Sequence, residues 1–264
     1  MVRKNWNFSN RHNEGVKLGH AVADSLRTAL KGLQKKSDSR DSNTLELVIP
    51  AKNLTDAGVR EVAIALLEVL SAPAGLPIYK LKELDLNNNA LTASSLRLLA
   101  EVIRIARFDL ELLDLSGNNI KVSTYEEARD WEAFLDSFEG CRVMRRLDLS
   151  NNNLSGFKAF EILSKVYGRQ SPVDPNVLNT LDSPGLTDTF EDKPDLIEIT
   201  NSARDIGISG LNASQSSLSN AMVLQSKQGL AAIPYILFQN TCMDDAGALW
   251  YSSVLEGHWL PQLL

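Results

Sequence analysis

The sequence predicts an α/β fold in which one strand–turn–helix unit is repeated along the chain. The clearest copy fits the pattern LxxLxLxxNxL at Leu81, Leu84, Leu86, Asn89 and Leu91. Period-two alternation places Leu84 and Leu86 on one face of a short strand. Apolar residues then recur at helical spacing at Leu96, Leu99, Ala100 and Ile103. Because this helix has a single apolar stripe, it must bury the stripe against its own strand and against neighbouring units.

The same pattern recurs along the chain, and recurrence is a stronger architectural signal than any single copy. Two further complete copies are Leu110, Leu113, Leu115, Asn118 and Ile120, and Met144, Leu147, Leu149, Asn152 and Leu154. Weaker copies start at Thr44 and Ile233, with Lys52 and Thr241 at the asparagine position. The steps between Leu47, Leu84, Leu113 and Leu147 are 37, 29 and 34 residues. Each step leaves room for a full helix.

These copies resemble the ribonuclease-inhibitor-like class of leucine-rich repeat proteins. The likeness is closest in NLTDAGVREVAIALLEVL (53–70) and NTCMDDAGALWYSSVL (240–255), where a short turn with a glycine is expected before the helix. The resemblance implies a horseshoe-shaped solenoid with a parallel sheet on the concave face and helices on the convex face. More loosely, the final segment resembles intracellular leucine-rich repeat proteins of fungi, which implies no particular activity.

The residue that follows the last apolar position of each copy predicts where the helix starts. These residues are Thr55, Thr92, Lys121, Ser155 and Asp244. All except Lys121 have side chains that accept hydrogen bonds from the free amides of a helix start.

Four segments are expected. Residues 1–43 form an amino-terminal segment whose helix, from about 14 to 35, caps the array and lacks a strand of its own. Residues 44–169 contain leucine-rich repeats. Residues 170–228 form a polar insertion rich in serine, proline and aspartate, which we expect to be partly disordered. The repeat resumes over residues 229–264, where Leu260 and Leu263 match the first two leucines of another unit. The array is therefore expected to end within a unit, as a fragment, as a short gene product, or with a partner over its end.

Several side chains are assigned to the interior. Trp131, Phe134, Leu135 and Phe138 stand at helical spacing and predict a buried stripe. Cys141 is expected to be a buried, unreactive side chain. Asn89, Asn118 and Asn152 share one position of the pattern, and we expect their amides to satisfy backbone groups of adjacent coils as a structural ladder.

The side chains between the strand leucines predict a partner-binding surface on the concave face. The candidate residues are Glu83, Asp85, Asn87, Asp114, Ser116, Arg146, Asp148, Ser150, Tyr235 and Gln239. Asp85, Asp114 and Asp148 are expected to form an acidic column, since neighbouring parallel strands lie about 5 Å apart. Two interpretations stay open: aspartate is common in such strands, or a basic segment of a protein partner docks there.

Composition and motifs narrow the range of functions that the sequence supports. The 264 residues carry a formal net charge of −6, which argues against general nucleic-acid binding. The first residues lack the apolar core of a secretory signal, and about eighteen consecutive apolar residues occur nowhere, so we expect a cytoplasmic or nuclear protein without a membrane span. The three histidines, His12, His20 and His258, are widely separated, and the sequence contains no recognised catalytic, metal or cofactor motif.

The sequence therefore predicts a non-catalytic protein–protein interaction scaffold, without a cofactor, that binds a protein partner on the concave surface. The alternative is a regulatory subunit, or a GTPase-activating type of regulator, of another enzyme. That alternative follows only from the resemblance, because the ribonuclease-inhibitor-like class includes such proteins. The oligomeric state is left open.

Overall fold

The computed structural model of the chain describes residues 3–34, 43–71, 79–155, 157–170 and 229–257. The chain divides into two compact units, Met1–Ser171 together with Lys227–Leu264, and Pro172–Ser226. The first unit contains every described residue.

Strands and helices alternate along this unit. Its strands are β1 (Arg3–Asn7), β2 (Asn43–Val48), β3 (Tyr79–Asp85), β4 (Leu112–Asp114), β5 (Arg146–Asp148) and β6 (Tyr235–Leu237). Its helices are α1 (Gly15–Gln34), α2 (Asp56–Leu70), α3 (Ala93–Ala106), α4 (Tyr125–Asp136), α5 (Phe157–Gln170) and α8 (Asp245–Gly257), and a short 3-10 turn, η1, covers Gly229–Ala232.

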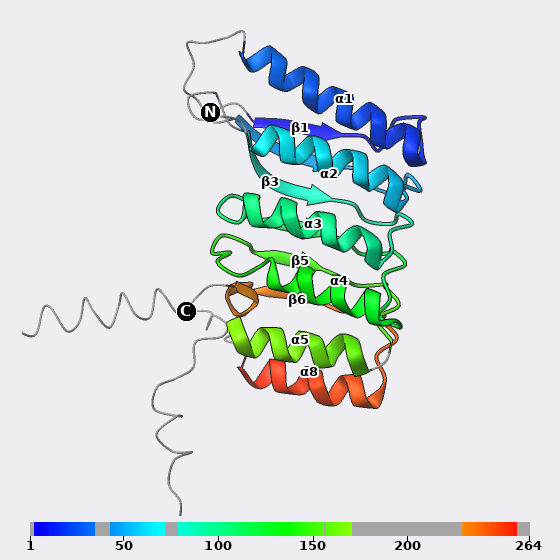
Figure 1. Cartoon of the computed structure of the whole chain (residues 1–264), viewed down its shortest axis with the longest axis vertical. Coiled ribbons are helices and arrows are strands. Elements are labelled where there is room, and N and C mark those ends of the chain that lie inside the picture. Colours follow the sequence, from blue (N-terminus) through cyan, green and yellow to red (C-terminus); the bar gives the residue numbers. More distant parts are fainter. Residues whose placement is uncertain (1–2, 35–42, 72–78, 156, 171–228, 258–264) are drawn as a thin grey trace, which may run out of the picture. The chain divides into compact units, whose positions relative to one another are not determined.

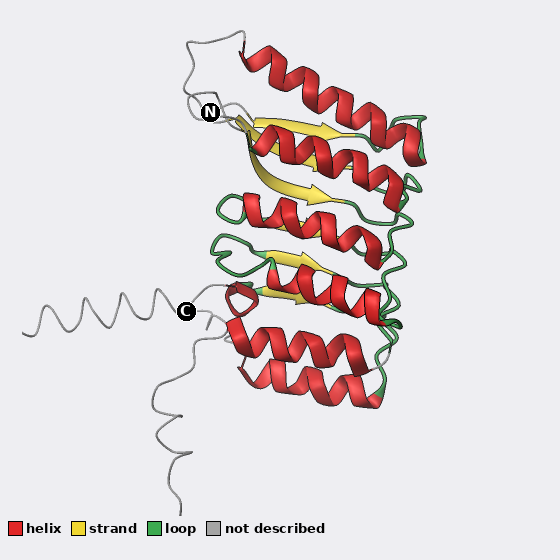
Figure 2. Cartoon of the chain, viewed as in Figure 1, coloured by secondary structure: helices red, strands yellow, loops and turns green. Residues whose placement is uncertain are grey.

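The six strands form one parallel sheet in the order β1-β2-β3-β4-β5-β6, which is also their order in the sequence. The helices lie side by side in the same succession on one side of the sheet (Figures 1 and 2). In the described element order a helix thus follows each strand, and the sheet does not close on itself. This α/β arrangement is consistent with a leucine-rich repeat solenoid, while the horseshoe curvature stays a prediction.

The pattern leucines form a continuous buried seam behind the sheet. Leu47, Leu84, Leu113 and Leu147 are direct neighbours in register, and each is completely buried. Burying one such side chain contributes about 1.5–3 kcal/mol to folding. The predicted burial of Trp131, Phe134, Leu135 and Phe138 is also confirmed. The first three residues lie in α4, and Phe138 lies in the turn that follows it. The Trp131 indole donates a hydrogen bond to the Ala159 carbonyl oxygen (2.9 Å), so its polar atom is satisfied as well.

The asparagines at the pattern position bridge successive coils. The Asn89 side-chain amide donates to the carbonyl oxygens of Ile49 (2.8 Å) and Leu86 (3.0 Å), which belong to different coils. Its Oδ1 accepts from the backbone N–H groups of Lys52 (3.0 Å) and Leu54 (2.9 Å). Asn118 and Asn152 make the equivalents of three of these bonds in the next two coils: two donated to carbonyl oxygens and one accepted from the N–H of Leu91 or Ile120. Backbone groups that the turn leaves without strand partners are satisfied in this way.

The amino-terminal segment differs from the expectation of a helix without its strand. Residues Arg3–Asn7 form β1, which pairs with β2 so that Trp6 lies beside Leu47. RKNWN contains no leucine, and its asparagines, Asn5 and Asn7, do not stand at the asparagine position of the pattern, which Arg11 occupies. The pattern therefore does not identify this strand. The position of the strand leucine is occupied by Trp6, which packs against the core.

Two local expectations also need correction. Helix α4 starts after Thr124 rather than at Lys121, because Thr124 and Glu127 form a capping box that fixes the start three residues later. Gly58 and Gly247 lie in the first turns of α2 and α8, not in a turn before the helix. The predicted cap residues Thr92 and Asp244 do accept amide hydrogen bonds, at 3.3 and 2.7 Å, whereas Thr55 is an N-cap without a side-chain bond.

The repeat resumes directly beside the fourth repeat after the predicted insertion. Strand β6 pairs with β5, and α8 packs against α5. The insertion itself, predicted at residues 170–228, lies outside the described residues apart from Gln170, as does the unfinished unit at Leu260 and Leu263.

Candidate partner-binding face

Two sets of side chains alternate along each strand. The pattern leucines point to the helices, and the residues between them point to the opposite face of the sheet, here named the open face. Within the described residues, no helix covers this face (Figures 1 and 2). Register aligns its side chains into rows across the strands. One row contains Glu46, Glu83, Leu112, Arg146 and Tyr235, and the next contains Val48, Asp85, Asp114, Asp148 and Leu237.

The predicted acidic column exists as an alignment of three aspartates on β3, β4 and β5. Asp85 pairs in register with Asp114, and Asp114 pairs with Asp148. Each carboxylate also accepts the backbone N–H two residues later, from Asn87 (3.0 Å), Ser116 (2.9 Å) and Ser150 (3.0 Å) respectively. This bond closes the turn after each strand, so the aspartates have a local structural role that explains their repetition.

Charge is distributed unevenly along the column. Arg146 Nη2 lies 2.6 Å from Asp148 Oδ2, so this carboxylate is already paired. Burial works to raise the pKa of Asp148, but the Arg146 guanidinium and the Ser150 N–H outweigh it, and the pKa is lowered. At Asp85, burial and the neighbouring Asp114 carboxylate raise the pKa, although bonds from Asn87 and the charge of Arg146 oppose this. The negative charge that Arg146 does not pair directly is therefore concentrated at Asp85 and Asp114.

A hollow of about 390 Å³ lies beside the column, at the amino ends of the strands. It is lined by Thr44, Glu46, Lys82, Glu83, Glu111, Leu112, Arg145 and Arg146. Glu111 lies between two cations, with Lys82 Nζ at 2.7 Å and Arg145 Nε at 3.9 Å. Lys82 lies within β3, whereas Glu111 and Arg145 stand just before β4 and β5. Sequence reasoning did not select these three residues, because no single residue type repeats at their position in the pattern. Their position immediately after the first residue of each copy is the signal that could have found them.

A known family matches a short part of the chain. A model of the leucine rich repeat family matches residues 144–164, which cover β5 and the first part of α5. The match supports a leucine-rich repeat protein. No curated protein matches the chain. The ribonuclease-inhibitor-like subtype and the likeness to fungal proteins stay predictions.

The candidate residues of the open face differ in exposure. Arg146, Tyr235 and Gln239 are exposed, and Glu83, Asp85, Asn87, Asp114 and Ser116 are half-buried. Asp148 and Ser150 are buried, contrary to the expectation that they point freely to solvent. The reason is mutual bonding: Asp148 binds Arg146 and the Ser150 N–H, and Ser150 Oγ accepts from the Gln239 N–H at 3.1 Å. A partner would therefore meet Asp85 and Asp114 before Asp148.

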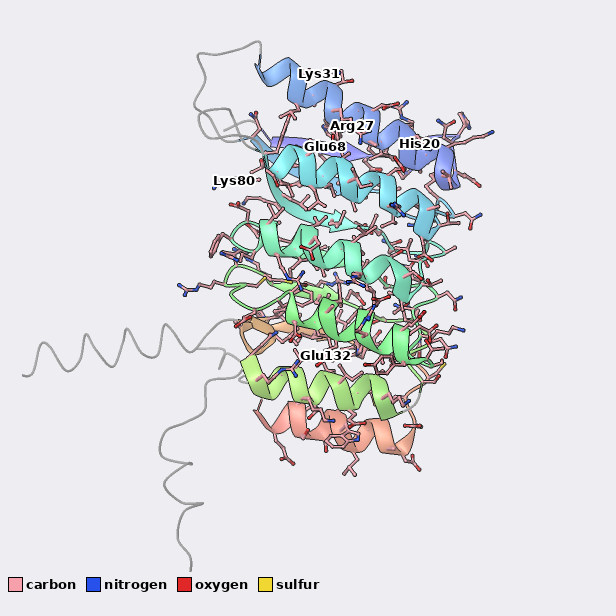
Figure 3. All side chains as sticks on the ribbon, in the orientation of Figure 1. His20, Arg27, Lys31, Glu68, Lys80 and Glu132 are labelled. Carbon is pink, nitrogen blue, oxygen red and sulfur yellow. The ribbon has the colours of Figure 1, made fainter. Side chains whose placement is uncertain are left out.

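On the helix side of the repeats, charged side chains pair between neighbouring helices. Figure 3 shows Arg27 on α1 and Glu68 on α2, which are joined by hydrogen bonds of 2.7 and 3.0 Å. Arg169 of α5 likewise contacts Glu132 (3.0 Å) and Asp136 (2.9 Å) of α4. These charged side chains of the helices therefore have partners within the fold. In contrast, the bonds described for Asp85 and Asp114 go to residues of their own turns.

The chemistry of the described residues is limited. In the described ranges, no group of three or more His, Cys, Asp or Glu side chains could hold a metal ion. Burial raises the pKa of the Cys141 thiol to about 12, so this side chain is a poor nucleophile at neutral pH. None of the described helices has both the length and the apolar character needed to cross a membrane.

Proposed function

We propose that this leucine-rich repeat protein is a non-catalytic interaction scaffold that binds a protein partner on the open face of its sheet. Leucine-rich repeats are commonly protein–protein interaction modules. They stack into extended surfaces that suit this role. The open face of this chain presents aligned rows of polar side chains on a rigid sheet. A rigid surface binds with little loss of conformational entropy, which favours association.

The observation that carries the proposal is the position of Asp85 and Asp114. The two carboxylates are held beside each other by the strand register and by bonds to their own turns, so they are pre-oriented. Their charges are close enough for Asp114 to raise the pKa of Asp85. A lysine or arginine side chain placed between them would relieve this repulsion. The partner is therefore proposed to contribute a basic segment that lies across β3 and β4.

The test replaces Asp85 and Asp114 with asparagine, in the double variant Asp85→Asn/Asp114→Asn. Asparagine removes the charge but keeps the Oδ1 acceptor that closes each turn, so the strands keep their geometry. The matched control is Glu101→Gln/Glu132→Gln, which makes the same change in net charge on α3 and α4. A partner would be captured from cell extract with the wild-type chain, and its Kd would then be measured with each variant.

We expect the aspartate variant to weaken binding about tenfold, corresponding to about 1.4 kcal/mol. The control should bind within about twofold of wild type, and added salt should weaken wild-type binding more than binding by the aspartate variant. Equal affinity of all three proteins for the captured partner would contradict the proposed surface. If that partner is a GTPase and its hydrolysis rate rises when the wild-type chain is added, the regulatory alternative replaces the scaffold.

A further inference from the structure

The β6 end of the described sheet carries an apolar groove of about 150 Å³. Its lining includes Pro234, Tyr235, Ile236 and Leu237 at β6, and Tyr251 and Leu255 of α8. Several of these side chains are more exposed than their counterparts within the sheet. Tyr235 is 64% exposed and Leu255 is 55% exposed. Ile236 is only partly buried, whereas Leu147, its neighbour in register, is completely buried.

The strand beside this groove has a free edge among the described residues. β6 pairs with β5 on one side, and no described strand pairs with its other side. An edge with unpaired backbone groups and apolar side chains favours the addition of another strand. We therefore expect this groove to bind an extended segment that carries apolar residues at the strand positions.

The chain itself contains such a segment shortly after α8 in the sequence. Residues 260–264 read LPQLL, and residues 233–237, which lead into and form β6, read IPYIL. The two segments match at every position: an apolar residue, a proline, a side chain for the open face, and two more apolar residues. The connection also fits, because two residues separate the end of α8 from Leu260, and three separate the end of α3 from Leu110.

We propose that residues 260–264 occupy this groove as the next strand of the sheet, paired in parallel with β6. In this register Leu260 lies beside Ile233, Gln262 beside Tyr235, and Leu263 beside Ile236. The seam of pattern leucines is thereby extended by one coil, and the exposed apolar side chains at the end of the array are covered.

Proline in the segment is compatible with this pairing. Pro234 occupies the same position in β6 and cannot donate a hydrogen bond, yet β6 pairs with β5. The bond at this point comes from the next residue, because the Tyr235 N–H donates to the Arg145 carbonyl oxygen at 3.2 Å. In the proposed strand, the Gln262 N–H donates to the Pro234 carbonyl oxygen in the same way.

The first test is a disulfide between the two neighbours on the open face. Tyr235→Cys and Gln262→Cys are introduced together in the full chain, with Cys242→Asn to remove the exposed native thiol; Cys141 stays, because it is buried. Paired residues of adjacent parallel strands lie about 4.8 Å apart, within the Cα separation that a disulfide accepts. The matched control pairs Gln262→Cys with Leu249→Cys on α8, a residue that is 72% exposed and does not line the groove.

Under mild oxidation we expect the Tyr235/Gln262 pair to form an intramolecular disulfide at least about tenfold faster than the Leu249/Gln262 pair. Similar rates for both pairs, or no intramolecular disulfide, would overturn the proposal. A disulfide between two molecules would overturn it as well, because the groove would then be filled by a second copy of the chain.

A second test compares melting temperatures and uses variants without added cysteines. Leu263→Asp places a charge in the apolar seam and should lower the Tm by several degrees, while Gln262→Asp places the same charge on the open face and should leave the Tm nearly unchanged. Equal melting temperatures for the two variants would overturn the proposed register.

Discussion

At the scale of single residues, α1 and α2 approach each other closely at Gly19 and Gly58. A Cβ atom added to Gly19 would contact the Gly58 carbonyl oxygen and lie 2.8 Å from its Cα. These are backbone atoms, which cannot rotate away as a side chain can. We predict that Gly19→Ala forces the two helices apart and lowers the free energy of unfolding by about 1–3 kcal/mol, measured by urea denaturation.

The same helix supplies the control for this variant. Gly32 also lies in α1, and a Cβ there would have no atom within 4 Å. Gly32→Ala should therefore raise stability, by up to about 1 kcal/mol, through helix propensity alone. If Gly19→Ala were as stable as Gly32→Ala, the close approach of α1 and α2 would be wrong.

At the scale of elements, the start of α4 is set by a capping box. Thr124 Oγ1 accepts from the Glu127 N–H (3.2 Å), and the Glu127 carboxylate accepts from the N–H groups of Ser123 (2.8 Å) and Thr124 (2.9 Å). Burial alone would raise the pKa of Glu127, but these bonds outweigh it, so the pKa lies below its ordinary value of 4.5. A lowered pKa means that the ionised form stabilises the fold above pH 4.5 and that this contribution is lost as pH falls through the lowered value.

Glu127→Gln should therefore destabilise the protein near neutral pH, by about 0.5 kcal/mol, because the amide is a weaker acceptor than the carboxylate. The difference in free energy of unfolding between wild type and variant should shrink as pH is lowered from 7 to 3, which denaturation at several pH values measures. Glu126→Gln, a neighbouring exposed residue in the first turn of α4, is the control. A difference that does not change with pH would show that the carboxylate is not the stabilising species.

Elements that repeat the leucine pattern could be predicted from the sequence, whereas elements that lack the pattern could not. The strands around Leu84, Leu113 and Leu147 follow from leucine spacing, since a period of two fixes which face is buried. β1 has no such spacing and is held by pairing with β2, which is a tertiary effect. The start of α4 differs from the expected position, Lys121, because the capping box of Thr124 and Glu127 lies outside the repeated pattern and sets the start three residues later.

The candidate site, too, could be predicted from the sequence only in part. The alignment of Asp85, Asp114 and Asp148 follows from the pattern, because equal positions of successive copies become neighbours in register. The pairing of Arg146 with Asp148 does not follow from it, since a side chain two residues away on the same strand can bend toward its neighbour or toward solvent. Exposure within the column therefore depends on packing that spacing does not encode.

At the scale of the whole molecule, the polar bridges between coils run along the array and change at its two ends. At the first end, Lys52 occupies the asparagine position, and its Nζ reaches the Arg11 carbonyl oxygen of the preceding coil (2.9 Å). A long side chain thus still connects two coils, although it bonds to a carbonyl oxygen at a different position from the one that Asn89 reaches in its own preceding coil. At the other end, Thr241 is too short to do so, and its hydroxyl donates to Phe238 in its own coil (3.0 Å).

Thr241→Asn should extend the asparagine ladder by one coil. By analogy with Asn152, which bonds to Leu115 and Ile120 of the preceding coil, an amide at 241 lies within reach of the Leu149 carbonyl oxygen and the Leu154 N–H. Position 241 is buried, so these bonds form away from water and are expected to contribute about 1 kcal/mol. The Tm should rise by about 2–4 °C in calorimetry.

Thr241→Ser keeps a hydroxyl and is the control, and its Tm should stay at or below that of wild type. If Thr241→Asn melts no higher than Thr241→Ser, the coil of β6 is not in the same register as the three coils before it, because only that register brings the amide to both backbone groups.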